Sequence, residues 1–240
     1  MSDTPPIDSE AGDNNAKQDH RPIRSYVIRA SRYTDAQKVA IDQHWDDYVI
    51  AYEARLFSSE ELFGNSNPLT VEIGFGMGDS LLEMAAANPQ LNFLGIEVHK
   101  PGVGKLLHGV VEQNLSNVKV FCHDAKEILA HCLEPASIAR LLIFFPDPWH
   151  KKRHNKRRLV QTDFITQQLP LLADGGRIHL ATDWEPYAEH MVEAMEAVEG
   201  IENLNGIGQF WQQPDRPETK FERRGIRLGH GVWDLLYQKR

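Results

Sequence analysis

Apolar runs alternate with helical patterns from Leu69 toward the end of the chain. Short runs of consecutive apolar residues, typical of strands buried on both faces, predict strands over 69–73, 92–96, 118–122, 141–145 and 177–181, with a late strand over 232–237. The stretches between them predict helices that begin at an Asp79 cap, span 99–113, begin at an Asp124 cap, span 159–172 and span 187–198. Three glycines are expected to loosen the 99–113 helix, and 193–205 gives no clear pattern. The alternation is typical of an α/β fold with a doubly wound parallel sheet.

The first part of the chain has a different composition. Residues 1–20 carry five acids against one lysine and almost no large apolar side chain, so we expect them to stay disordered. The sign of the charge then reverses over 21–38, which could form a second basic surface or an ordinary amphipathic segment. We therefore predict a disordered acidic tail over 1–22 and one domain over 23–240, in which 23–65 is a basic, helical extension and 66–240 holds the sheet.

Composition narrows the class of protein. With 240 residues, 41% of them hydrophobic and 25% charged, the chain can bury a full core. No apolar run approaches the roughly 20 residues that span a bilayer, and 1–21 lacks the basic and apolar parts of a signal peptide. Cys122 and Cys132 lie too far apart for a Cys-x-x-Cys pair, and the histidines are scattered. We expect a cytoplasmic protein with reduced thiols and no metal.

Positive charge is concentrated in one short run. Six of the eight residues over 151–158 are Lys or Arg, in a chain whose formal charge is -8. A concentrated block of this kind is expected where a protein neutralises the phosphates of a nucleic acid. A solvated charged face or a disordered basic arm explains most basic runs, so the run alone leaves both interpretations open.

A glycine-rich turn follows the strand over 69–73. Gly74, Gly76 and Gly78 come after Glu72, where missing side chains let a ligand approach the backbone. Dinucleotide sites have the spacing Gly-x-Gly-x-x-Gly, whereas this turn has Gly-x-Gly-x-Gly with an acid just ahead of it. A carboxylate there would repel a pyrophosphate but could hold the amino group of S-adenosylmethionine. The turn therefore favours that cofactor, with a tight turn of incidental glycines as the alternative.

Acidic residues also follow the next two predicted strands. Glu97 ends the second strand, about 20 residues after the glycine turn, where a carboxylate can accept from both hydroxyls of a ribose. NAD would use such a residue too, so Glu97 does not distinguish the two cofactors. Asp124 follows the third strand, where an adenine ring would lie. Each acid alone could be a helix cap or an exposed side chain, but the carboxyl ends of parallel strands are where open α/β sheets bind ligands.

A carboxylate between two prolines follows the fourth strand. Pro146 and Pro148 restrict the backbone on either side of Asp147, and Phe145 and Trp149 offer aromatic faces on which a base could stack. Core packing is the alternative interpretation of Trp149. The combination predicts a reaction site at this strand end.

Together these stretches resemble the bacterial tRNA (guanine-N7)-methyltransferases of the TrmB type. The matching residues are 72–78, 95–99, 122–125, 144–158, 181–184 and 219–225. The Phe-Pro-Asp-Pro-Trp and Thr-Lys-Phe-Glu pieces are far more specific than a glycine turn. The resemblance extends from Leu69 to near the C-terminus. It implies a Rossmann-like, seven-stranded class I S-adenosylmethionine-dependent methyltransferase sheet with helices on both faces.

The resemblance also implies roles for individual residues. The residues expected to hold S-adenosylmethionine are Glu72, Gly74, Gly76, Gly78, Glu97, Asp124 and Asp147, with Asp147 as the catalytic position. Those expected to contact the substrate are Lys151, Asp183, Thr219, Lys220, Phe221 and Glu222. Those expected to bind RNA are Arg153, His154, Asn155, Lys156, Arg157 and Arg158. The implied target is a guanosine of the tRNA variable loop, position 46 in tRNA numbering.

Guanine chemistry restricts the mechanism. N7 of guanine carries a lone pair and no proton, so it can attack the sulfonium methyl group without a general base. We therefore expect Asp147, with Asp183, to orient the guanine and to offset the positive charge that grows on the ring. Stacking on Trp149 or Trp184 would favour an extruded base. If the last strand runs antiparallel, as the resemblance implies, the loop over 219–230 would border the site and add Lys220, Arg223, Arg224 and Arg227 to the basic surface.

Three alternatives remain open from the sequence. An NAD-dependent oxidoreductase fits the fold but not the glycine spacing. A non-catalytic RNA-binding protein on a methyltransferase scaffold would share the basic run, and an exocyclic-amine methyltransferase could also place an acid beside prolines. We expect tRNA as the partner, no membrane partner, and a monomer or weak homodimer.

Overall fold

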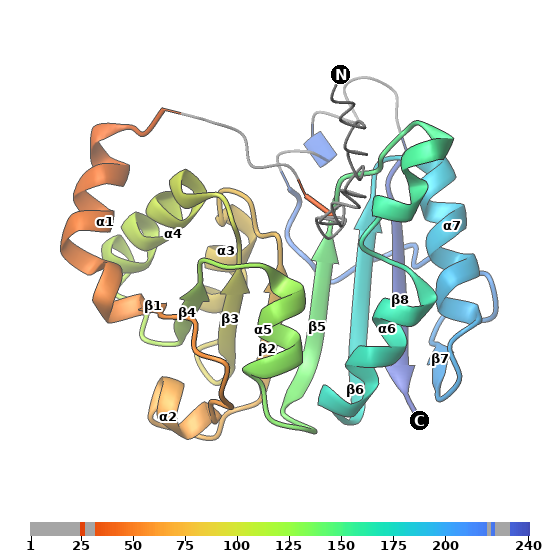
Figure 1. Ribbon diagram of the computed structural model, residues 1–240, viewed down its shortest axis with the longest axis horizontal. Helices are drawn as coiled ribbons and strands as arrows, with labels where there is room; N and C mark the ends of the chain where they lie inside the picture. Colours follow the sequence, from red (N-terminus) through yellow and green to blue (C-terminus); the bar gives the residue numbers. More distant parts are fainter. Residues whose placement is uncertain (1–24, 27–31, 220–221, 224–230) are drawn as a thin grey trace, which may run out of the picture.

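The computed structural model describes residues 25–26, 32–219, 222–223 and 231–240 (Figure 1). Its strands are β1 (Val49–Ile50), β2 (Leu69–Ile73), β3 (Asn92–Ile96), β4 (Val118–Phe121), β5 (Ile138–Phe144), β6 (Leu172–Thr182), β7 (Ile201–Asn203) and β8 (Trp233–Lys239). Its α-helices are α1 (Asp35–Tyr48), α2 (Ser59–Phe63), α3 (Asp79–Ala87), α4 (Lys100–Glu112), α5 (Ala125–His131), α6 (Thr162–Gln168) and α7 (Glu185–Glu196). Two 3₁₀ helices are η1 (Lys152–Arg157) and η2 (Leu169–Leu171).

The strands form one sheet in the order β1-β4-β3-β2-β5-β6-β8-β7. Every neighbouring pair from β1 to β6 is parallel, and β8 is antiparallel to both β6 and β7. The predicted class of sheet is confirmed, with eight strands in place of seven because the two-residue β1 pairs with the outer side of β4. The chain proceeds outward from β2 in one direction and from β5 in the other. The strand order therefore reverses between β2 and β5, where open α/β sheets bind ligands.

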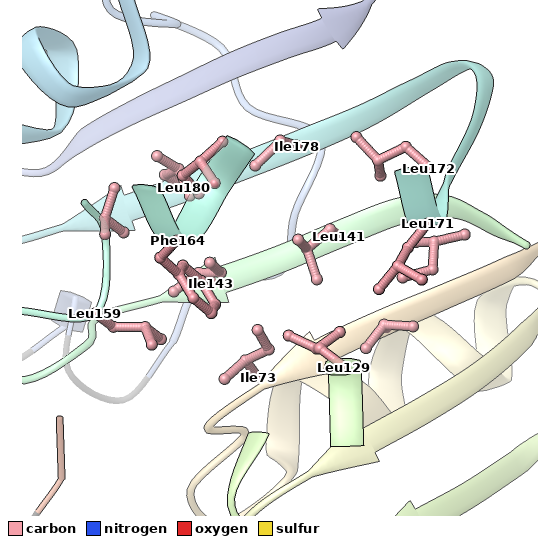
Figure 2. Packing of buried hydrophobic residues seen from close by; sticks show 14 of the residues in the cluster. Ile73, Leu129, Leu141, Ile143, Leu159, Phe164, Leu171, Leu172, Ile178 and Leu180 are labelled. Carbon is pink, nitrogen blue, oxygen red and sulfur yellow. The ribbon is translucent and has the colours of Figure 1, made fainter. Parts of the chain in front are cut away.

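Side chains of the sheet alternate between two faces, and helices lie on both. In β5, Leu141 and Ile143 pack with α5, α6 and α7 in one hydrophobic cluster, part of which Figure 2 shows. Leu142 and Phe144 pack with α3 and α4 in a second cluster. Burial on both faces explains why the central strands are continuous apolar runs in the sequence.

Element boundaries differ from the prediction where polar residues or prolines interrupt the pattern. The fourth strand was predicted to begin at Leu141 because the charged Arg140 interrupts the apolar run, but β5 begins at Ile138. The fifth was predicted to begin at Arg177, but β6 begins at Leu172. The helix predicted over 159–172 is the shorter α6, and Pro170 lies in η2 after it. The stretch 193–205, which gave no clear pattern, contains β7. The predicted Asp79 cap is wrong, because Gly78 occupies the cap position.

The glycines of α4 allow close packing rather than loosening the helix. A Cβ built on Gly102 would lie 1.9 Å from the carbonyl oxygen of Gly76, and one on Gly109 would lie 2.4 Å from Leu82 of α3. A Cβ on Gly104 would lie 2.9 Å from the Ile41 side chain of α1. The helix therefore approaches the glycine turn and two neighbouring helices at distances that only glycine permits.

The segment before β2 contains the expected helix, but it also supplies β1, so the prediction that 66–240 holds the whole sheet is wrong. α1 begins with a capping box between Thr34 and Gln37 and packs on α4. Residues 1–24 and 27–31, which include the predicted acidic tail and part of the basic segment, lie outside the described residues. The boundary after residue 22 remains a prediction. Within the part of the chain that the structure describes, no helix combines the length and apolar character needed to cross a membrane.

Candidate functional site

The glycine turn between β2 and α3 leaves space in front of its backbone. Gly74, Gly76 and Gly78 have φ angles of 74°, 59° and 76°, in the left-handed region that other residues rarely adopt. A Cβ built on Gly74 or Gly76 would meet no atom within 4 Å. The backbone of the turn can therefore be approached directly by a ligand.

Glu72 lies in β2, two residues before the turn, as a buried acid. The residue is 3% exposed, and its Oε2 atom has no hydrogen-bond partner among the described residues. Burial, together with repulsion from Glu97, raises the pKa of the Glu72 carboxyl to about 8. A buried polar atom without a partner costs free energy until a donor reaches it. An ammonium group would be such a donor and would favour the ionised carboxylate.

Glu97 follows β3 and holds the turn in place. Its Oε2 atom accepts a hydrogen bond from the Gly76 backbone at 2.9 Å, and its Oε1 atom accepts from the backbone of Val98 and His99 at 2.7 and 3.0 Å. A carboxylate has about four lone-pair directions, so these bonds use about three of them. Accepting from both hydroxyls of a ribose would require Glu97 to release one backbone N–H.

Asp124 follows β4 and caps α5, as the sequence predicts. Its Oδ1 atom accepts from the Lys126 backbone at 2.9 Å. The Glu97 backbone donates to the Phe121 carbonyl at 3.1 Å, which keeps the ends of β3 and β4 together. Three acids thus follow one another along neighbouring strand ends.

These residues fit S-adenosylmethionine. The unpartnered Glu72 carboxyl suits a cationic amino group, and the open turn can accept a ligand against its backbone. Glu97 and Asp124 would lie toward the ribose and the adenine. A pyrophosphate would instead meet two carboxyl groups in its immediate surroundings.

The loop after β5 is strained on both sides of Asp147. Phe145 and Trp149 have φ angles of 50° and 48°, and such conformations of large residues cost about 1–3 kcal/mol each. Pro146 and Pro148 restrict the residues between them. The Asp147 side chain is exposed. The loop therefore presents this carboxylate on a backbone with little freedom to move.

The loops after β5 and β6 contact each other. The two strands are parallel neighbours, so Asp147 and Asp183 follow adjacent strand ends. The rings of His150 and Trp184 meet edge to face with centroids 4.4 Å apart. The two acids expected to orient the substrate therefore belong to loops that pack together.

Other residues of the protein contact the Trp149 side chain, so it is only partly available for stacking on a base. The Arg157 guanidinium lies over the Trp149 ring, 4.0 Å from its centroid, and the Trp149 indole nitrogen donates to the Ser25 carbonyl at 3.2 Å. Since Arg157 covers one face of Trp149, Trp184 is the better candidate for stacking on a base.

The basic run forms η1 and is not uniformly exposed. Lys151, Lys152, Arg153 and Lys156 are exposed. Arg158, expected to bind RNA, is 5% exposed instead, and its Nε atom donates to the Pro148 carbonyl at 2.9 Å.

Arg158 therefore stabilises the Asp147 loop from inside and does not belong to the exposed basic surface. His154 and Asn155 are half-buried. Partial burial and the neighbouring charges of Arg153 and Arg157 lower the pKa of His154, so its imidazole adds no positive charge at neutral pH.

Thr219 and Glu222 are joined by reciprocal hydrogen bonds. The Glu222 backbone donates to Thr219 Oγ1 at 3.1 Å, and the Thr219 backbone donates to Glu222 Oε2 at 3.2 Å. The same Glu222 oxygen accepts from Arg216. The expected substrate-binding residues Lys220 and Phe221 lie outside the described residues, as do Arg224 and Arg227.

A buried charged network that the sequence did not predict joins His179 of β6, Asp234 of β8 and Arg216 of the segment before β8. Arg216 donates to the two carboxylate oxygens of Asp234 at 2.6 and 2.8 Å, and His179 Nε2 lies 2.7 Å from Asp234 Oδ1. All three residues are buried. The available signal was a polar residue among apolar neighbours in two predicted strands, His179 and Asp234, since a buried charge needs a partner.

Ionisation in this network follows from the competition between burial and pairing. Burial alone would raise the pKa of Asp234, but hydrogen bonds from His179 and Arg216 lower it below its ordinary value. Burial lowers the pKa of His179 despite the hydrogen bond to Asp234. A neutral His179 can donate from Nε2 to Asp234 and accept at Nδ1 from Arg140, whose Nη2 lies 3.2 Å away.

The chain is similar to known methyltransferases over most of its length. A family described as "Putative methyltransferase" matches residues 66–235. The tRNA (guanine-N(7)-)-methyltransferase of Pseudomonas paraeruginosa is 52% identical over 244 residues, covering 100% of this chain and 99% of the relative. That of Stutzerimonas stutzeri is 54% identical over 220 residues, covering 91% and 92%.

A solved structure shares the fold. It is a putative methyltransferase from Streptococcus mutans in complex with SAH, with a TM-score of 0.50, 11% identity and coverage of 73% of this chain and 90% of that chain. Sequence identity of about half over the full length goes well beyond this likeness in fold. The chain belongs to the tRNA (guanine-N(7)-)-methyltransferase family.

Proposed function

We propose that this protein transfers a methyl group from S-adenosylmethionine to N7 of a guanine in tRNA, at position 46 of the variable loop. The observation that carries the proposal is the placement of an open glycine turn, an unpartnered buried acid and a rigid Asp147 loop at one edge of the sheet. The names of the full-length relatives support N7 of guanine in tRNA as the target.

The residues of the chain act by holding and orienting. S-adenosylmethionine, when bound, supplies a methyl group on a positively charged sulfur. Guanine N7 has no proton to lose, so no side chain is required as a base. Asp147 and Asp183 accept from the N1–H and the exocyclic amine of guanine, which orients the base and offsets its growing positive charge. Glu72 holds the amino group of the cofactor, and Glu97 its ribose.

The exposed part of η1 supplies the surface for the RNA backbone. Lys151, Lys152, Arg153 and Lys156 are the exposed cations of the run, and Arg223, which follows Glu222, is a further exposed cation. Binding to phosphates displaces counterions, so replacement of Lys152, Arg153 and Lys156 by Gln should weaken tRNA binding and flatten its salt dependence. Affinity for the cofactor, measured in parallel, should not change.

The proposal is tested by methyl transfer from labelled S-adenosylmethionine to unmodified tRNA, followed by nucleoside analysis. Label in 7-methylguanosine, absent when position 46 is replaced by adenosine, is the expected result. Label in another guanosine would rule out position 46 as the target. Label in a nucleoside methylated on an exocyclic amine would rule out N7 as the methylated atom. Cofactor binding without any labelled nucleoside would remove tRNA as the substrate.

The proposed role also predicts where the protein is found and how it assembles. A protein that modifies tRNA is expected in the cytoplasm, where its substrate lies. We expect a monomer or a weak homodimer, which sedimentation of the full chain at several concentrations would distinguish. Within the described residues, no group of three or more His, Cys, Asp or Glu side chains could hold a metal ion.

A further inference from the structure

We propose that the outermost strand, β1, contributes to cofactor binding by placing Tyr52 against His123, and that this stacked pair fixes the loop after β4 that carries Asp124. Tyr52 and His123 are positioning residues, which act on the adenine end of S-adenosylmethionine through Asp124. The inference rests on the cofactor-binding part of the proposed function and not on the choice of tRNA as the substrate.

β1 brings Tyr52 beside the end of β4. The two strands are parallel, with Ile50 opposite Phe121, and β1 lies at the outer edge of the sheet (Figure 1). Tyr52 follows Ile50 by two residues, and His123 follows Phe121 by two residues. The chain therefore leaves both strands at the same edge of the sheet and in the same register. The rings of Tyr52 and His123 are stacked there, with centroids 4.1 Å apart and planes 9° from parallel.

Contacts on both sides of Tyr52 hold it in this place. β1 pairs with β4 before it, and the Cys132 thiol donates to the carbonyl of Glu53 after it, at 3.3 Å. The Phe57 backbone donates to the Cys132 carbonyl at 2.9 Å, and the Phe57 ring meets that of Phe121 edge to face with centroids 5.7 Å apart. Cys132 is the C-cap of α5. The segment after β1 is therefore joined to the end of α5.

A second contact fixes the His123 ring. Its Nε2 atom bonds to Oε2 of Glu127, in the first turn of α5. Stacking restrains the tilt of the imidazole and this bond restrains its rotation. Asp124 directly follows His123 and caps α5 with Oδ1, which is one of its two carboxylate oxygens. The pair thus holds the backbone from which Asp124 can accept from the exocyclic amine of an adenine.

The stacked pair adds little to the hydrophobic core. Tyr52 is 36% exposed, and the side chain of His123 is 32% exposed. Its effect is instead on the order of the loop after β4. A loop that is already held in place loses less freedom when a ligand binds, and this favours affinity. The contact between Tyr52 and His123 is therefore expected to change cofactor affinity more than it changes the fold.

Calorimetric titration with S-adenosylhomocysteine tests the proposal. Tyr52→Ala should raise the dissociation constant about 3- to 10-fold, which is the effect expected from the loss of one aromatic pair. Tyr52→Phe keeps the ring and should bind as the wild type does. Tyr48→Ala is the matched control, because Tyr48 lies at the other end of β1, directly before Val49. An unchanged dissociation constant in Tyr52→Ala, or an equal loss in Tyr48→Ala, would overturn the proposal.

A double-mutant cycle separates an effect through Asp124 from a general loosening of the site. Asp124→Ser removes the carboxylate but keeps a residue that caps helices well. Tyr52→Ala should weaken binding of S-adenosylhomocysteine little further in that background, because both changes act on the same contact. Combined with Glu72→Gln, at the amino-group end of the cofactor, the two losses should multiply. Losses that multiply with Asp124→Ser, or that fail to multiply with Glu72→Gln, would contradict the proposed route through Asp124.

Proton NMR of the unliganded full chain tests the stack without any cofactor. The Tyr52 ring should shift the signals of the His123 ring upfield, and His123→Gln identifies these signals by their loss. The shift should disappear in Tyr52→Ala and persist in Tyr52→Phe. Signals of His123 that do not respond to Tyr52→Ala would show that the stack does not form, and the proposal would fall.

Kinetics complete the test. In Tyr52→Ala, KM for S-adenosylmethionine should rise while kcat for methyl transfer to tRNA stays within about twofold, because only binding of the cofactor is weakened. A lowered kcat with an unchanged KM would contradict the proposal. Weaker binding of S-adenosylhomocysteine by Tyr52→Ala, in a protein that does not methylate tRNA, would uphold this inference while the proposed function fails.

Discussion

The two halves of the candidate site differ in whether their buried polar groups have partners within the protein. At the ends of β2, β3 and β4, the buried Oε2 atom of Glu72 has no hydrogen-bond partner among the described residues, and Gly74 and Gly76 of the glycine turn face open space. At the ends of β5, β6 and β8, Arg216, Asp234 and His179 are buried as well, but their charges are paired within the protein. The first half is incomplete until a ligand arrives, whereas the second is assembled in advance.

This difference matches the chemistry expected of each half. A cofactor that must bind and leave in every cycle benefits from a site whose unmet hydrogen bond it supplies itself. If Asp147 orients the substrate as we propose, its loop must hold the carboxylate in one place regardless of the ligand, which calls for internal support. The comparison predicts that changes in the second half alter catalysis or stability, and that changes in the first half alter cofactor binding.

The largest expected effect is on catalysis. Asp147→Asn removes the charge that we propose offsets the positive guanine ring, and we expect the rate of methyl transfer to fall by about 10²-fold or more. Single-turnover rates with saturating tRNA would measure it. Asp163→Asn, an exposed acid in the first turn of α6, is the control and should retain its rate. An Asp147→Asn enzyme with a normal rate would rule out the electrostatic role of Asp147.

The next effect is on stability. Asp234→Asn leaves Arg216 buried without its carboxylate, and breaking a buried pair in this way costs about 3–5 kcal/mol of unfolding free energy. Urea denaturation followed by circular dichroism would measure the loss. Glu202→Gln, which breaks only the exposed pair with Arg240, should cost less than about 1 kcal/mol. Equal losses in the two variants would mean that the paired half is not internally supported.

Glu72 should give the unliganded protein a distinct pH dependence. Between the ordinary pKa of 4.5 and the raised value of about 8, the native protein keeps a proton that the unfolded chain has lost. Raising the pH through this window therefore favours unfolding, by an amount on the order of a few kcal/mol. The unfolding free energy of Glu72→Gln, compared with that of the wild type from pH 5 to 8, should lack this decline. Parallel curves for the two proteins would show that Glu72 is not held protonated.

The smallest effect tests the approach of α4 to the glycine turn. The added methyl of Gly102→Ala would meet the Gly76 carbonyl, so the turn must shift, at a cost of about 1–3 kcal/mol and with weaker cofactor binding. Gly109→Ala is the matched control, because its methyl meets the movable Leu82 side chain instead of backbone. Calorimetric titration with S-adenosylhomocysteine should weaken for the first variant only. Equal affinities would separate the turn from the cofactor site.

The sequence predicted the first half better than the second because its signals are local. Glu72 and the glycines lie within seven consecutive residues, and Glu97 and Asp124 each follow a recognisable strand. Asp147 could likewise be predicted as a site residue from its position between Pro146 and Pro148. Each of these residues can be recognised from neighbours within a few positions in the sequence.

The support of the second half depends on contacts between distant parts of the chain. Asp234 meets Arg216 and His179 only after β8 has inserted beside β6, with 55 residues separating His179 from Asp234. Likewise, nothing in the run 151–158 distinguishes the buried Arg158 from its exposed neighbours, since burial is set by the carbonyl of Pro148 and the ring of Tyr187. The glycines of α4 were misread for the same reason, because their partners belong to other elements.

We expect the cofactor to supply the missing hydrogen bond at the ends of β2, β3 and β4, and to leave the paired residues at the ends of β5, β6 and β8 unchanged. Hydrogen exchange of the full chain with and without saturating S-adenosylhomocysteine tests it most directly. The account predicts slower exchange over the glycine turn at 74–78 and unchanged exchange at Thr219 and Glu222. Slower exchange at Thr219 and Glu222 with an unaffected glycine turn would contradict it.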